Sequence, residues 1–117
     1  MKYIIKTMKA KNNKNLYIPI FKDESFDVLS DFLFSEMRNF KSSVLKTIEK
    51  SNKSSKKVGF VGNCVAFTIE DDVAIIEGTI DGANSDQRII MKKSDFVELI
   101  NRWLQDLREL KEQKIKT

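Results

Sequence analysis

Apolar and polar residues alternate along the second half of the chain, which is the pattern of half-buried β-strands. Between residues 65 and 69 every second side chain is large and apolar, and this predicts a strand with one buried face. Residues 73–80 form the next predicted strand, whose first half is apolar on both faces, as in the centre of a sheet. Asp71-Asp72 forms the turn between these strands, and residues 81–86 form a second turn before a returning strand at residues 87–91.

The N-terminal part of the chain predicts a β-hairpin. Residues 3–8 and 16–21 have strand character, and the residues between them are polar and typical of a turn. Pro19 lies inside the second run, where it cannot donate a ladder hydrogen bond. The second strand is therefore expected at the edge of a sheet or at a bulge.

The middle of the chain carries apolar residues at the three-and-four spacing of an amphipathic helix. This helix is expected from about residue 26 to residue 49, with Asp23 or Ser25 as its N-cap. The apolar stripe is interrupted, so a break near Ser35 or at residues 42–43 would divide it into two shorter helices.

A final helix is predicted after Ser94, which is a good N-cap. Its apolar face carries residues at helical spacing between Phe96 and Leu110, and Trp103 lies on that face. Trp103 is therefore expected in the core, although a partly exposed Trp at this position would act as an interface anchor. The Lys-rich tail after Leu110 is expected to fray.

These elements predict one α+β domain spanning residues 1–117. We expect an antiparallel sheet of four to six strands, packed against a central helical segment and a C-terminal helix. The connector at residues 50–57 is polar and basic and contains no apolar residue. It is expected to be a flexible loop.

Composition excludes several kinds of catalytic site. The 117 residues contain no His and one Cys, Cys64, so Ser/His and Cys/His nucleophile pairs and His-containing zinc sites cannot be built. Nucleotide-binding glycine motifs are also missing, since Gly59 and Gly62 are not followed by Lys-Ser/Thr. We expect no cofactor, no metal and a binding role rather than an enzyme, although catalysis by carboxylates such as Glu70 or Glu77 stays open.

The cellular setting is expected to be the cytoplasm. A single cysteine cannot form an intrachain disulfide, and no apolar run approaches the roughly 20 residues of a membrane-spanning helix. Lys2 and Lys6 interrupt the apolar N-terminus before it reaches the length of a signal-peptide core. Cys64 lies next to apolar residues and is expected to be a small buried hydrophobe.

The net charge of the chain is +4, but the two halves of the chain differ in the sign of their charge. The first 57 residues are strongly basic, whereas acidic residues gather in and around the predicted turns of the second half. A negative surface there would select a basic protein partner and speed its association, while the alternative is that Asp simply suits turns. The candidate partner-binding residues are Glu70, Asp71, Asp72, Glu77, Asp81 and Asp86.

Lysines gather in the two polar connectors of the basic half. Such lysines can contact nucleic-acid phosphates without reading the sequence, but neither connector holds an aromatic residue to stack on bases or an Arg to read guanine. A nucleic-acid-associated phage or plasmid accessory protein is therefore the alternative function. The lysines concerned are Lys9, Lys11, Lys14, Lys50, Lys53, Lys56 and Lys57.

The second half of the chain, with its three strands followed by a helix, resembles the small α+β immunity proteins of bacterial polymorphic and contact-dependent toxin systems. The run from Arg88 through Ser94-Asp95-Phe96 to Trp103 is the most similar portion. The resemblance implies tight binding to a cognate toxin domain and no catalysis, and it transfers no site residue. We accordingly expect a protein-binding inhibitor; pairing of two copies through an edge strand or the final helix is a further possibility.

Overall fold

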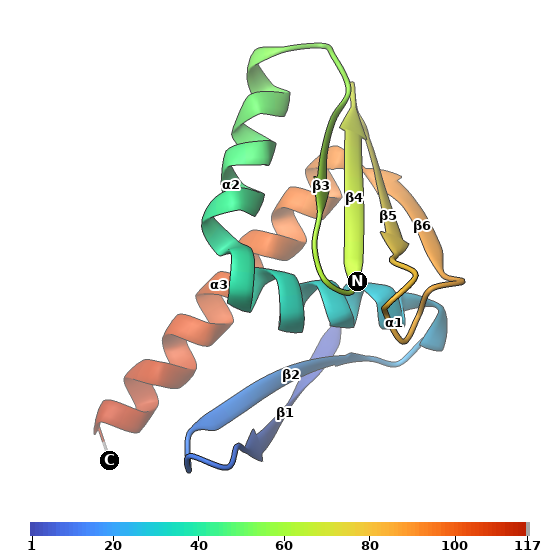
Figure 1. The fold of residues 1–117 in the computed structure, drawn as a ribbon. Coiled ribbons are helices and arrows are strands. Elements are labelled where there is room, and N and C mark those ends of the chain that lie inside the picture. The colour runs from blue at the N-terminus through green and yellow to red at the C-terminus, as the bar shows by residue number, and fades with distance from the viewer. Residues whose placement is uncertain (117) are drawn as a thin grey trace.

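The protein has an α+β fold, as predicted, with six strands divided between two antiparallel sheets (Figure 1). The computed structural model describes the backbone of residues 1–116 and the side chains of residues 1–112. The strands are β1 (Tyr3–Lys9), β2 (Asn15–Phe21), β3 (Val58–Val61), β4 (Val65–Glu70), β5 (Val73–Gly78) and β6 (Arg88–Lys92). The helical elements are the 3₁₀ turn η1 (Glu24–Phe26), α1 (Asp27–Asp31), the π-helical turn η2 (Phe32–Glu36), α2 (Met37–Lys53) and α3 (Lys93–Lys116).

The larger sheet is a meander in the order β3-β4-β5-β6. β5 lies between β4 and β6, so the central position predicted from its apolar first half is confirmed. The β4–β5 turn is at Asp71-Asp72, where Asp71 adopts a left-handed φ of 52°, a conformation that Asp tolerates better than most residues. The alternation predicted for β4 is also confirmed, because Val65, Phe67 and Ile69 are all buried.

The inner face of this sheet packs against both helical segments. Phe32 of η2, Phe67 of β4 and Phe96 of α3 form an aromatic cluster, with ring centroids 5.2 to 5.7 Å apart. Such edge-on and tilted ring pairs stabilise a core beyond the area that they bury. Trp103 is 1% exposed, which confirms its predicted place in the core.

The central helical segment is bent where the sequence suggested a break. A π-helical turn, η2, replaces α-helix around Ser35, and Phe40 has non-helical angles within α2. An added residue in a helical turn changes the direction of the next turns, so α1 and α2 run in different directions (Figure 1). Residues 42–43, the other predicted point of division, are helical.

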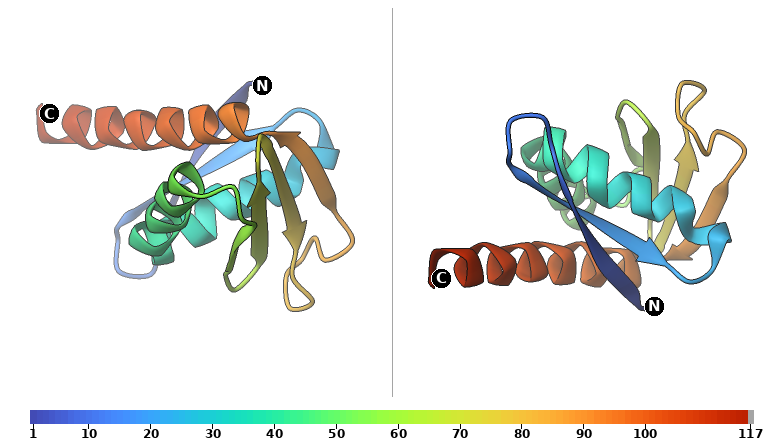
Figure 2. Two further views of the ribbon diagram at one scale, coloured as in Figure 1. Left: turned by 90° about the horizontal axis from the view of Figure 1, so that it is seen from above. Right: turned by 90° about the horizontal axis from the view of Figure 1, so that it is seen from below.

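The hairpin of β1 and β2 forms the second sheet, on the side of α1 away from the meander (Figures 1 and 2). Pro19 lies in one of only two strands, which agrees with the edge position predicted for it. Tyr3 ties the hairpin to α3. Its ring packs edge-on against Trp103, with centroids 5.7 Å apart, and its hydroxyl donates to Asp106.

Two predicted boundaries are wrong. Residues 50–53, expected in the loop, form the last turn of α2, because Lys, Ser and Asn do not stop a helix and lysines suit its C-terminal end. β6 leads straight into α3 at Lys93, so Ser94 lies inside the helix rather than at its N-cap. The helix continues past Leu110 to Lys116, since this stretch contains good helix formers. Fraying of this tail stays a prediction, and Thr117 is outside the described residues.

Candidate functional site

The six predicted acidic residues fall into two groups at opposite ends of the meander. Glu70, Asp71 and Asp72 lie at the β4–β5 turn, whereas the other three are at or beyond the far end of β5. Six residues of extended chain span about 20 Å, so the two groups do not make one continuous patch.

The group at the β4–β5 turn is accompanied by basic residues. Asp71 and Asp72 border a shallow depression that is also lined by Lys53 and Lys93, and the backbone N–H of Lys93 donates to the carbonyl of Asp72 at 2.7 Å. Neighbouring lysines offset the negative potential of these carboxylates. This end of the sheet therefore carries mixed charge.

The other group is joined by carboxylates from the start of the central helical segment. The side chain of Gln87 accepts from the backbone N–H of Val28 at 2.8 Å and donates to the carbonyl of Glu24 at 3.1 Å. Asn84 donates to Asp31 at 2.6 Å. The β5–β6 loop is thereby fastened to η1 and α1. We call these joined segments, together with the adjacent end of β5, the acidic end, because they carry seven carboxylates: Asp23, Glu24, Asp27, Asp31, Glu77, Asp81 and Asp86.

Two carboxyl groups of the acidic end have pKa values that depart from the ordinary Asp value, in opposite directions. Partial burial, followed by the neighbouring charge of Asp27, raises the pKa of Asp31, while the Asn84 hydrogen bond works against this rise. The pKa of Asp23 is lowered by its hydrogen bonds from the side chain and backbone of Ser25, which cap η1. Arg88 offsets part of the charge through a solvated contact with Glu77 at 3.9 Å, a pairing of small energy.

Two apolar side chains stand out beside these carboxylates. Ile80, in the β5–β6 loop, is 91% exposed and Val61, at the end of β3, is 79% exposed. They are the two most exposed large apolar side chains among the described residues. Isolated exposed apolar residues are common on protein surfaces, but here they adjoin charged groups on the same end of the sheet.

The loop that presents Ile80 is held in place by contacts with the β3–β4 turn. Thr79 donates its backbone N–H to the carbonyl of Cys64 at 2.9 Å and its hydroxyl to that of Asn63 at 2.8 Å. Gly82 lies so close that an added Cβ would be 2.5 Å from the Cys64 carbonyl oxygen. The exposure of Ile80 is thus a feature of a fixed loop. Cys64 itself is half-buried against the core, less buried than predicted.

A buried carboxylate supports the β3–β4 turn on which this loop rests. Glu36, at the end of η2, is fully buried, and its Oε1 accepts the backbone N–H groups of Asn63 at 2.8 Å and Cys64 at 3.2 Å. Its Oε2 has no partner, and burial raises the pKa of Glu36 despite these bonds. Gly62 leaves room for it, since a Cβ there would lie 2.3 Å from Glu36 Cγ.

The remaining predicted sites occupy separate places. Glu70 and Glu77, the alternative catalytic pair, are exposed at opposite ends of the meander. The lysines of the β1–β2 turn and those of the α2–β3 connector also lie at opposite ends of the molecule, so they do not form one surface (Figure 1). Within the described residues no cluster of three or more Cys, Asp or Glu side chains is arranged to hold a metal ion.

None of the described helices combines the length and apolar character needed to cross a membrane. No protein-family model, curated protein or solved structure matches this chain.

Proposed function

We propose that the protein binds and inhibits a basic partner protein through the acidic end. The observation that carries this proposal is that hydrogen bonds fasten the loop that exposes Ile80 to η1 and α1, so that the joined segments carry seven carboxylates. Protein interfaces commonly combine an apolar anchor at the centre with polar groups at the rim. The acidic end offers both an exposed apolar side chain and charged groups.

Binding would begin with long-range attraction between this surface and a positively charged partner. Docking would then bury Ile80 in an apolar depression of the partner, and the surrounding carboxylates would pair with its Lys and Arg side chains. A partner whose basic surface is its own working site would be blocked. This is how an immunity protein neutralises a toxin domain, and the predicted resemblance to that class agrees with the proposal.

The proposal is tested by capture of the partner from a lysate of the native cell, followed by affinity measurement. The double variant Asp81→Lys/Asp86→Lys and the single variant Ile80→Ser should each weaken binding, by about tenfold or more, without lowering the unfolding temperature. Mass spectrometry identifies the captured protein and calorimetry gives its affinity.

The matched control is Asp71→Lys/Asp72→Lys, at the other end of the same sheet. It makes the same change in net charge, so a general electrostatic effect would appear in both double variants. Retained binding in the control and lost binding in the acidic-end variants would support the proposal. Equal loss in both, or no loss in either, would contradict it.

A further inference from the structure

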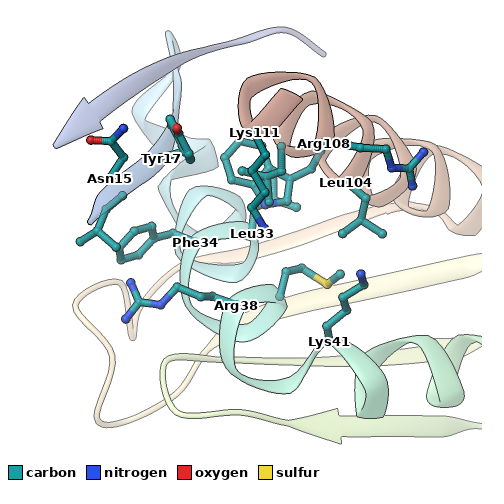
Figure 3. Close-up of a pocket in the computed structure, with 13 residues that line it drawn as sticks. Asn15, Tyr17, Leu33, Phe34, Arg38, Lys41, Leu104, Arg108 and Lys111 are labelled. Carbon is teal, nitrogen blue, oxygen red and sulfur yellow. The ribbon is translucent and has the colours of Figure 1, made fainter. Parts of the chain in front are cut away.

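A groove on the other side of the molecule has a different chemical character. It lies between β2, η2, the start of α2 and the second half of α3, and has a volume of about 450 Å³ (Figure 3). That volume is within the range of about 300–1,000 Å³ that is typical of small-molecule sites. Its floor is aliphatic and aromatic, formed mainly by Leu33, Met37, Trp103, Leu104 and Leu107.

Four cations border this groove, two from each helix. Arg38 and Lys41 come from α2, and Arg108 and Lys111 come from α3; Figure 3 shows them along both sides of the apolar floor. Among the described residues no acidic side chain lines the groove, and none of the four cations makes an ion pair there. Cations that line one groove without an acidic side chain beside them favour a bound anion.

Two further contacts position the arginine side chains of the groove. The guanidinium of Arg38 lies over the ring of Phe34, 5.1 Å from its centroid, which fixes the cation beside an apolar wall. Arg108 donates to Gln105 at 3.0 Å. The indole N–H of Trp103, by contrast, is buried without a hydrogen-bond partner, and an unmet donor of this kind is costly in a folded protein.

We infer that the groove binds an amphipathic anion, with an aliphatic body on the leucine-rich floor and an anionic head among the four cations. The floor favours an aliphatic chain over a nucleic acid, whose bases and sugars need polar partners as well as stacking surfaces. The volume suits one small molecule rather than a protein segment. This site is separate from the acidic end, so the inference does not depend on the proposed function.

Trp103 is the sole tryptophan of the chain, so its fluorescence reports directly on the groove. The test titrates the full chain with dodecanoate, kept below its micelle concentration, and follows the Trp emission. We expect a saturable change with one dodecanoate per chain. Dodecanol, which has the same chain without the charge, should bind at least about tenfold more weakly, and acetate should produce no change.

The variant Lys41→Ala/Lys111→Ala removes one cation from each side and should weaken dodecanoate binding by about fivefold or more. Its matched control is Lys46→Ala/Lys50→Ala, which removes two exposed lysines of α2 that do not line the groove. Circular dichroism checks that both variants are folded. The variant Leu104→Gln, on the floor, should weaken dodecanoate and dodecanol alike.

Three outcomes would overturn the inference. The first is no saturable change with dodecanoate. The second is equal binding by the groove variant and its control, which would indicate adsorption to the surface in general. The third is tight binding of a thymidine oligonucleotide that is lost in the groove variant, because the groove would then be a nucleic-acid site.

Discussion

The acidic end and the cation-lined groove are built in opposite ways by the same chain. The acidic end presents an apolar side chain, Ile80, outward on a loop that is fastened to a carboxylate-bearing helical segment. The groove is concave and holds its apolar side chains inward, with the cations at its border. A net charge of +4 conceals this division, so the overall charge says little about which partner each region suits.

The two regions depend on different contacts, although η2 contributes to both, through Glu36 for the acidic end and through Leu33 and Phe34 for the groove. The acidic end is fixed by two hydrogen bonds: the backbone N–H of Val28 in α1 donates to Gln87 of the β5–β6 loop, and the backbone N–H of Asn63 in the β3–β4 turn donates to Glu36. The groove is formed by the angle between α2 and α3 and by the hairpin that Tyr3 fastens to α3. Changes in one region should therefore leave the other intact, and this independence can be tested.

The largest effect is expected from Gly78→Ala, at the base of the β5–β6 loop. A Cβ at this position would lie 1.9 Å from the backbone oxygen of Asn84 and 2.9 Å from Cα of Ser85, so the loop itself must move. We expect a loss of about 3 kcal/mol in the free energy of unfolding, measured with urea. The folded fraction should lose its partner yet still bind dodecanoate.

Gly59→Ala is the control for this experiment. Its Cβ would come 3.3 Å from a methyl group of Thr68, a side chain that can shift on an open sheet face. The expected change is within about 1 kcal/mol. If Gly78→Ala proved as stable as Gly59→Ala, the close packing described for the acidic end would be wrong.

A smaller effect is expected at Glu36. Replacement by Ala removes the acceptor for two buried backbone N–H groups and should cost about 1–3 kcal/mol. Gln keeps an acceptor oxygen and carries no charge. Burial raises the pKa of Glu36 in the folded state. Below the ordinary Glu pKa the protonated side chain therefore contributes its full share to the stability of the fold. That contribution is lost as the pH rises through the raised pKa of the folded state.

Glu36→Gln should therefore gain stability relative to the unmodified protein as pH rises above the ordinary Glu pKa. Urea unfolding at a series of pH values measures the difference between the two proteins. Asp31, whose pKa is also raised, is present in both and cancels in that difference. A difference that stays constant with pH would mean that Glu36 has an ordinary pKa.

Local patterns were sufficient to predict the hairpin, three of the four strands of the meander and the two helical segments. Alternation of apolar residues, as in β4, reports directly on which face of a strand is buried. The boundaries of the helices were harder to predict from the sequence. Lys50 to Lys53 read as a loop by composition, but the preceding turns of α2 continue through them, and a helix extends readily once it has formed.

The acidic end could be predicted only in part. Glu77, Asp81 and Asp86 are in one turn region, but Asp31 and its neighbours reach it through contacts between residues more than 50 positions apart. No local pattern carries that information. Glu36 did leave a signal, since it lies four residues after Phe32 and three after Leu33, on the apolar stripe. An acidic residue at such a position indicates a buried partner.

The groove was not predicted at all. Trp103 was correctly expected in the core, yet the cations beside it come from two helices and become neighbours only when those helices pack. Each helix alone shows ordinary basic residues on a solvated face. A combination of an aliphatic floor and unpaired cations is therefore a property of the tertiary structure.

The smallest effect is expected at the contact that fastens the hairpin to α3. Burial, together with the hydrogen bond to Asp106, raises the pKa of Tyr3 to about 12. Because the folded pKa is raised, the neutral phenol contributes stability below the ordinary value of 10.0 that is lost as pH rises towards about 12. Tyr3→Phe keeps the ring packing and loses the hydroxyl, so it should cost about 1 kcal/mol near neutral pH. The variant should also lose less stability than the unmodified protein at alkaline pH. The difference between the ultraviolet pH titrations of the two proteins measures the ionisation of the Tyr3 phenol. Ionisation of Tyr3 near pH 10.0 would show that the hairpin is not held against α3 in solution, and the groove between them would then lack one of its walls.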